Sequence, residues 1–235
     1  MIIKLLKHFL KILRNIFVGD YRSKLLSEII VKMILKYSAN NDVIKIMDYG
    51  SGFQPKLIYF VYKKLKHTYN KNVIIYCFDK YSLQDLEKLN QNKDIIFNKI
   101  ENIHLDKTNY DFCLLSDVLH HIGVEKVSEL KNLINNLQKK AKFILIKDHY
   151  QYGYFSNYTL RVMDFLGNYF NNVKTPRTYF TKKSFKYLLQ MTNSTIVEEI
   201  LNIKLYQSYF LFMSNPKFNF VYLIKNVEKN NVEKI

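Results

Sequence analysis

A short apolar stretch that runs into two closely spaced glycines constrains this chain more than any other feature. Residues 44–52 have the sequence Ile-Lys-Ile-Met-Asp-Tyr-Gly-Ser-Gly, so we expect a buried strand to end at Asp48 and Tyr49. Gly50 and Gly52 follow it, and glycine permits both a tight turn and a close approach of the backbone to a ligand. The pattern therefore predicts a ligand-binding turn at the end of a strand.

Short apolar segments alternate with helical patterns along most of the chain. This alternation is typical of an α/β fold with a largely parallel sheet covered by helices on both faces. The expected strands span residues 44–49, 73–78, 95–98, 112–116, 143–147, 196–203 and 218–226, and the expected helices span residues 22–38, 57–66, 83–89, 124–139 and 182–191.

The 235 residues suffice for one α/β domain with a small addition. We expect an N-terminal helical cap over residues 1–40 and the main domain over residues 41–226. An aromatic segment at about residues 149–180 interrupts the strand and helix pattern and is expected to form a lid. A polar tail over residues 227–235 ends the chain.

The chain carries a net charge of +16, mostly from lysine, with only four arginines. Such a charge is compatible with attraction to nucleic acid or to anionic lipid. A dedicated phosphate-binding protein would use more arginine, whose planar group makes two parallel hydrogen bonds. Cys77 and Cys113 both lie in apolar segments, which favours buried thiols in a reduced, cytoplasmic protein over a disulfide.

The first 18 residues form a basic amphipathic pattern in which Lys4, Lys7, Lys11 and Arg14 share one helical face. The charges interrupt any continuous apolar run, so the segment is expected to be neither a secretory signal nor a transmembrane span. Two alternatives remain open. The helix lies peripherally on an anionic membrane surface, or it packs on the domain as a plain cap.

Two further segments carry polar side chains at the ends of expected strands. The strand at 73–78 is followed by Asp79 and Lys80. Residues 110–122, Tyr-Asp-Phe-Cys-Leu-Leu-Ser-Asp-Val-Leu-His-His-Ile, place Ser116 and Asp117 at the end of another strand. The carboxyl ends of parallel strands lie at one edge of a sheet, so these residues are expected to lie near the glycine turn.

Taken together, these segments resemble the class I S-adenosylmethionine-dependent methyltransferases. The shared motifs are the hydrophobic-hydrophobic-Asp-x-Gly-x-Gly turn, the acid after the second strand, and the aromatic-Asp-hydrophobic strand followed by Val-Leu-His-His-Ile. They cover about residues 44–147. The resemblance implies a three-layer, doubly wound, mostly parallel seven-stranded sheet with a reversed terminal hairpin strand. It also implies S-adenosyl-L-methionine as the cofactor, bound by Asp48, Tyr49, Gly50, Ser51, Gly52, Asp79, Lys80, Ser116, Asp117 and His120.

In the resembled family, the acid after the second strand accepts hydrogen bonds from both ribose hydroxyls. Asp79 would take that role, which suits a carboxylate because it only accepts hydrogen bonds. The family's frequent third glycine is replaced by Gln54, and its acid after the third strand is absent, so Asn98 or Glu101 would replace it. Pro55 occupies the third glycine position of the dinucleotide fingerprint, which disfavours a nicotinamide or flavin enzyme.

The adjacent His120 and His121 raise the question of a metal site. Neighbouring residues point to different sides of a helix, so the two histidines are expected to be a poor chelating pair. We therefore expect no metal here, with one histidine near the cofactor and the other structural.

The acceptor side is expected where the strand at 143–147 ends. His149 is the candidate catalytic base, because its pKa suits proton transfer, and Asp148 is the candidate group that orients it or binds substrate. Alternatively, both residues brace the lid. The aromatic residues that follow either line an apolar acceptor pocket or form core beneath the lid; they are Tyr152, Tyr154, Phe155 and Tyr158.

These observations predict a cytoplasmic methyltransferase that acts on a small-molecule or lipid-linked acceptor, with oxygen the expected methylated atom. One alternative is a nucleic-acid methyltransferase, which the charge suggests. Another is a degenerate module that binds the cofactor or a partner without turnover. Nothing in the sequence identifies the acceptor.

Overall fold

The computed structural model describes residues 20–38, 42–52, 55–80, 92–168, 173–206 and 215–227. Three predictions fall on other residues: the amphipathic segment at 1–18, the helix at 83–89 and most of the polar tail. The departure at Gln54 also lies outside the described residues.

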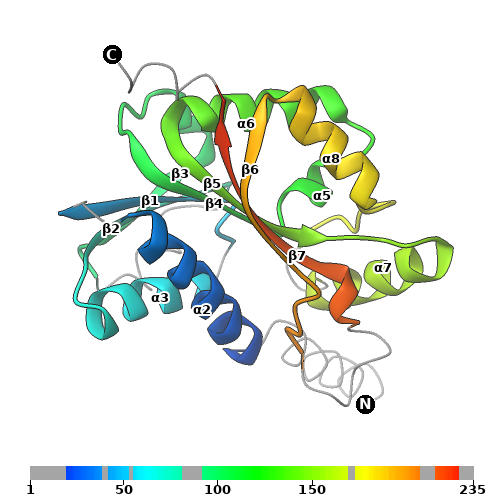
Figure 1. Ribbon diagram of the computed structural model, residues 1–235, viewed down its shortest axis with the longest axis horizontal. Coiled ribbons are helices and arrows are strands. Elements are labelled where there is room, and N and C mark those ends of the chain that lie inside the picture. Colours follow the sequence, from blue (N-terminus) through cyan, green and yellow to red (C-terminus); the bar gives the residue numbers. More distant parts are fainter. Residues whose placement is uncertain are drawn as a thin grey trace, which may run out of the picture.

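A seven-stranded sheet forms the middle layer of the molecule (Figure 1). Its spatial order is β3-β2-β1-β4-β5-β7-β6, and its neighbours pair in parallel except around β7, which runs antiparallel to both β5 and β6. This confirms the predicted doubly wound sheet with a reversed terminal hairpin strand. The strands are β1 (Val43–Tyr49), β2 (Asn72–Asp79), β3 (Ile95–Lys99), β4 (Tyr110–Ser116), β5 (Ala141–His149), β6 (Ser194–Leu201) and β7 (Asn219–Asn226).

Helices cover both faces of this sheet, which makes the fold three-layered (Figure 1). On one face lie α2 (Asp20–Tyr37) and α3 (Lys56–Lys63), and on the other lie α6 (Val127–Lys140) and α8 (Lys182–Met191). A hydrophobic core lies on each face of the sheet, and successive residues of β4 pack alternately into one core and the other. Phe112 packs with α2 and α3, whereas Cys113 packs with α6 and α8. Burial on both faces explains the continuous apolar strands.

The predicted elements agree with the structure within a few residues at most ends, and α8 has the predicted bounds. Two differences matter for the site. The helix expected at 124–139 begins only at Val127, as α6, and an unpredicted short helix α5 (Leu119–Ile122) precedes it, with Gly123 at φ +113° after α5. Beyond β5, residues Tyr154–Asn168 form one continuous helix, α7, within the predicted lid.

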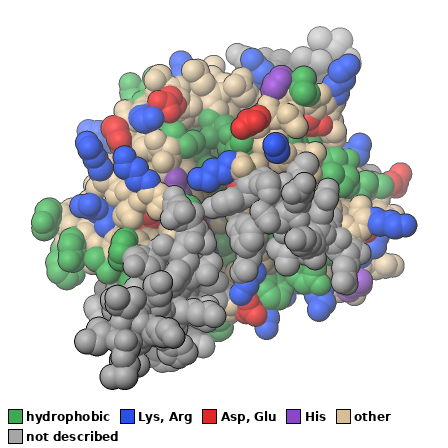
Figure 2. Space-filling view, turned by 180° about the vertical axis from the view of Figure 1, so that it is seen from behind, with side chains coloured by type: hydrophobic (Ala, Val, Ile, Leu, Met, Phe, Trp, Pro, Cys, Tyr) green, Lys and Arg blue, Asp and Glu red, His purple; other side chains and the backbone are tan. Residues whose placement is uncertain are grey.

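The aromatic residues at the start of α7 neither line a pocket nor form core, so the structure differs here from both alternatives. The helix buries the face that carries Ser156, Thr159, Leu160, Met163 and Gly167. The aromatic residues lie on the opposite face or just before the helix, and Tyr154 is 89% exposed. Figure 2 shows hydrophobic side chains gathered at the edge of the molecule where α7 lies, amid scattered Lys and Arg. The exposed aromatic residues are Tyr152, Tyr154, Phe155 and Tyr158.

None of the helices within the described ranges is long and apolar enough to span a bilayer. The helix α2 lies in the predicted N-terminal cap, and its buried face, which includes Leu26, Ile30 and Ile34, packs on the sheet and on α3.

Phe185 of α8 anchors the second core, because its buried ring contacts the rings of Phe180, Phe220 and Tyr222. We expect Phe185→Ala to lower the free energy of unfolding by about 3–5 kcal/mol, the usual cost of such a cavity. Chemical denaturation measures this. The control is Tyr187→Ala on the exposed side of the same helix, which should change stability by less than about 0.5 kcal/mol. Equal losses in the two variants would contradict the assigned packing.

Candidate functional site

The direction of chain crossover reverses between β1 and β4, the two central strands of the sheet. From β1 the chain continues to β2 and β3 on one side, and from β4 to β5 on the other. Such a switch point leaves a crevice outside the carboxyl ends of the strands. Asp48 and Ser116 lie at these ends, and Asp79 ends the neighbouring β2.

The turn after β1 needs glycine at both predicted positions. Gly50 and Gly52 each have φ +76°, which favours glycine strongly, and the Gly50 N–H donates to the carbonyl oxygen of Phe78 at 2.8 Å. A Cβ on Gly50 would lie 2.7 Å from a methyl group of Val118, whereas a Cβ on Gly52 would meet nothing within 4 Å. Gly50 therefore allows close packing against the segment after β4, and Gly52 keeps space open.

Asp79 is held by the glycine turn itself. One carboxylate oxygen accepts the Gly52 N–H at 2.7 Å, and the other accepts the Lys80 N–H at 2.7 Å. A carboxylate only accepts hydrogen bonds, and these two bonds fix its orientation beside the turn. Burial, and then repulsion by Asp79, raise the pKa of the nearby Asp48 to about 7. This end of the crevice thus concentrates two buried carboxyl groups.

A cavity of about 520 Å³ extends from this turn, which lies within the usual range for a small-molecule site. Of the twelve predicted site residues, Asp148 and His120 do not line it. The ten that do are Asp48, Tyr49, Gly50, Ser51, Gly52, Asp79, Lys80, Ser116, Asp117 and His149. Of the two proposed replacements for the third-strand acid, neither Asn98 nor Glu101 lines it, although Ile100 between them does.

An ion network lies in the cavity wall, with Lys147 fully buried and Arg22 and Asp117 partly buried. The Asp117 carboxylate contacts the guanidinium of Arg22 on α2 and the ammonium of Lys147 on β5. His149 Nε2 lies 3.1 Å from the same carboxylate and 3.0 Å from Lys147 Nζ. Burial alone would raise the pKa of Asp117, but Arg22 and Lys147 hold it well below its usual range. Burial, and then Lys147, lower the pKa of His149 to about 4.

Asp148 orients a different histidine from the one we predicted. Its carboxylate lies 2.6 Å from Nδ1 of His120, and both side chains are almost fully buried. The reason is strand geometry: consecutive residues of β5 point to opposite faces, so Asp148 cannot reach the ring of His149. Burial alone would lower the pKa of His120, but Asp148 and Asp164 raise it to about 10.

The cavity residues missing from the sequence-based set include three charged or ionisable side chains: Arg22, His121 and Asp164. Arg22 and Asp164 lie on α2 and α7, outside the motifs, so only the tertiary structure brings them to the site. His121 had been set aside because adjacent helical residues usually diverge. In the four-residue helix α5, however, the rings of His120 and His121 lie with centroids 4.3 Å apart.

Sheet order, switch-point crevice and glycine turn together define the Rossmann-like fold of class I methyltransferases. Solved structures with this fold match the chain. The plantazolicin methyltransferase BpumL in complex with SAH gives a TM-score of 0.61 at 14% identity, covering 94% of this chain and 90% of that chain. The mitomycin 7-O-methyltransferase MmcR gives 0.59 at 10% identity, covering 89% and 54%.

A third match is an O-methyltransferase family 2 protein from Planctomyces limnophilus in complex with apigenin. It gives a TM-score of 0.53 at 14% identity, covering 78% of this chain and 51% of that chain. This chain thus spans about half the length of such O-methyltransferases. No protein-family model and no curated protein sequence matches it. At these identities the likeness establishes the fold.

The raised pKa of Asp48 predicts a pH-dependent stability. Its unfolded carboxyl has a pKa near 3.9, so the stability it contributes is present below about pH 4 and is lost as pH rises through about 7. We expect Asp48→Asn to raise the melting temperature more at pH 8 than at pH 5.5. Thermal unfolding at the two pH values measures this, with exposed Asp42→Asn as the control. An equal gain at both values would contradict it.

The ion network predicts a large cost for removing its carboxylate. Asn tolerates the left-handed backbone of position 117, φ +58°, so Asp117→Asn isolates the loss of charge. We expect a loss of about 3–5 kcal/mol in the free energy of unfolding, since the fully buried Lys147 and the partly buried Arg22 lose their counter-charge. Adding Lys147→Met should recover part of this loss in denaturation experiments.

Glu129→Gln provides the control, because its ion pair with Lys126 is exposed and should be worth less than about 1 kcal/mol. A loss at Asp117 no greater than this control, or no recovery in the double variant, would contradict the role of the network.

Proposed function

We propose that this protein is an S-adenosylmethionine-dependent methyltransferase that acts on a small-molecule acceptor, with oxygen as the methylated atom. The observation that carries the proposal is one continuous cavity at the switch point. It joins the glycine turn and Asp79 at one end to a wall of histidine, aspartate and tyrosine side chains at the other. One cavity can therefore hold a cofactor and an acceptor side by side.

The residues at the turn fit the proposed cofactor. Gly52 leaves open space beside the backbone, and the fixed carboxylate of Asp79 offers lone pairs to a pair of hydroxyls. The buried carboxyl of Asp48 is ionised more readily when a cationic ligand lies near it. When bound, S-adenosylmethionine supplies an electron-poor methyl group. BpumL, which has the same fold, was solved with SAH, and this supports the assignment.

The other wall supports a small acceptor. Leu160, Met163 and Tyr179 contribute apolar surface, while His121 and Asp164 contribute polar groups. This mixture is usual for sites that bind small organic molecules and fix their orientation. Positioning supplies much of the rate of a methyl transfer, so a closed, shaped wall is the main requirement. MmcR is a mitomycin 7-O-methyltransferase, and the Planctomyces limnophilus protein was solved in complex with apigenin; both compounds are small molecules, which supports this class.

Oxygen as the methylated atom rests on the polar groups of this wall and on the two O-methyltransferase matches. The predicted catalytic roles of His149 and Asp148 stay predictions. His149 lines the cavity beside Asp117 and Lys147, and Asp148 acts on the wall indirectly, through His120.

Calorimetry with SAH tests the cofactor half of the proposal. We expect Asp79→Ala to weaken SAH binding tenfold or more, because charge-assisted hydrogen bonds are worth about 1.5–3 kcal/mol each. Asp79→Asn, which keeps one acceptor oxygen, should lie between the alanine variant and the natural protein. The exposed Asp42→Ala is the control and should bind normally. Unchanged affinity in Asp79→Ala would contradict the role of this carboxylate.

Mass spectrometry after incubation with S-adenosylmethionine and a panel of phenols, alcohols, amines and thiols tests the acceptor class. We expect methylation among the hydroxyl compounds. Failure of the natural protein to bind either S-adenosylmethionine or SAH would defeat the enzyme proposal and would favour a degenerate partner-binding module. Methylation of nucleic acid, with binding that weakens steeply as salt rises, would favour the nucleic-acid alternative.

A further inference from the structure

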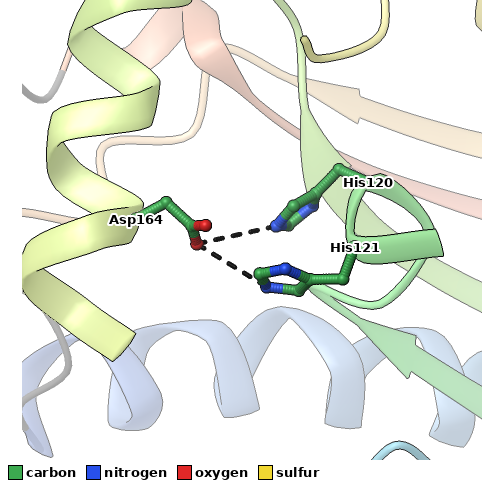
Figure 3. A group of neighbouring side chains, drawn as sticks. All are labelled: His120, His121 and Asp164. Carbon is green, nitrogen blue, oxygen red and sulfur yellow. Dashed lines mark ion pairs between the residues drawn. The ribbon is translucent and has the colours of Figure 1, made fainter. Parts of the chain in front are cut away.

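His120, His121 and Asp164 converge at the acceptor end of the cavity (Figure 3). Nε2 of His121 lies 3.6 Å from Oδ1 of Asp164, and Nε2 of His120 lies 3.8 Å from the same oxygen. These three atoms all lie within 4.8 Å of one another. Two imidazole nitrogens and one carboxylate oxygen thus face a common point from two separate helices, α5 and α7.

Each histidine is oriented through its other nitrogen. Nδ1 of His120 lies 2.6 Å from the buried carboxylate of Asp148, and Nδ1 of His121 lies 3.3 Å from the carbonyl oxygen of Lys174. With Nδ1–H donating to these oxygens, Nε2 is the nitrogen of each ring that faces Asp164, and a metal ion that displaces the Nε2 proton of His120 would meet both lone pairs there. Metal-binding histidines are commonly held in this way, by a carboxylate or a backbone carbonyl on the nitrogen opposite the metal.

One of the three converging atoms, Nε2 of His120, and the second carboxylate oxygen of Asp164 are buried without a hydrogen-bond partner. The side chain of His120 is only 1% exposed. Oδ1 of Asp164 accepts a hydrogen bond from the amide of Asn168 at 2.9 Å, which fixes the carboxylate. A buried nitrogen aimed at a carboxylate 3.8 Å away is too far for a hydrogen bond, and this spacing leaves room for a bridging ion.

The spacing suits a small divalent ion. Zn²⁺ binds nitrogen and oxygen at about 2.0–2.2 Å, which sets tetrahedral ligand atoms roughly 3.3–3.6 Å apart. The separation between His121 and Asp164 matches this range, and that between His120 and Asp164 exceeds it by a few tenths of an ångström. Two histidines with one carboxylate are also the ligand set of catalytic zinc sites, which keep a fourth position open.

We infer that His120, His121 and Asp164 form a binding site for a divalent transition-metal ion, best suited to Zn²⁺, with its open position toward the methyl acceptor. His121 and Asp164 line the cavity and His120 lies behind them, so the open side of the site faces the cavity. There the ion would hold the acceptor oxygen and lower its pKa, as bound zinc does for water. This second part rests on the proposed function, whereas metal binding itself does not.

Titration of the metal-stripped full chain with Co²⁺ tests the inference, because cobalt in a site of low coordination number has visible absorption bands. We expect one ion per chain, displaced by Zn²⁺. The variants His121→Ala and Asp164→Asn should lose this binding. Asp148→Asn should weaken it on the order of 10–100-fold, which is the usual effect of removing a group that supports a ligand. The control His104→Ala removes an exposed histidine outside the cluster and should bind normally.

Circular dichroism and SAH calorimetry on the same variants separate the outcomes. Folded His121→Ala and Asp164→Asn proteins that bind SAH but not the ion support the inference. Absence of the cobalt bands in the natural protein, or equal binding in these variants and in His104→Ala, overturns it. If the natural protein binds SAH but no ion, then the metal site alone fails. If it binds the ion but neither SAH nor S-adenosylmethionine, the metal site stands and the proposed function fails.

Discussion

The partly buried carboxylate of Asp117 makes the ion pairs on which the rest of the site depends. It lies just beyond β4 and binds Arg22 of α2 and Lys147 of β5, so one group joins the N-terminal cap to the two strands that carry the cavity wall. Burying three charges is costly unless each is paired. The pairing therefore fixes α2 at one position over the crevice, and His149 is held in the same contact.

Site residues could be predicted from the sequence where their placement depends on local pattern, but not where it depends on contacts between residues far apart in the sequence. Asp48, Gly50, Gly52 and Asp79 follow directly after strands, so local pattern alone placed them correctly at the cavity. The contact between Arg22 and Asp117 joins residues 95 positions apart, and no local pattern reports it. The pairing of Asp148 with His120 was missed because the alternation of side chains along β5 was not applied to neighbouring polar residues.

The adjacent His120 and His121 are an exception to the rule that neighbouring residues of a helix point to different sides. Neighbours on a long helix do diverge, but α5 is a four-residue turn between Val118 and Gly123, and its two rings lie against each other. The third member of the cluster comes from α7, which lies in the aromatic segment that the sequence indicated only as a lid. A cluster whose members come from two elements depends on how those elements pack, and so it emerges only with the tertiary structure.

The helix α7 has a consequence for how such a protein can change over generations. It alone contributes Leu160, Met163 and Asp164 to the cavity, whereas the glycine turn and Asp79 come from β1 and β2. Substitutions within this one helix can reshape the space for an acceptor and leave the opposite end untouched. Under the proposed function, selection could therefore shift the preferred acceptor through a few codons while the cofactor-binding end is inherited unchanged.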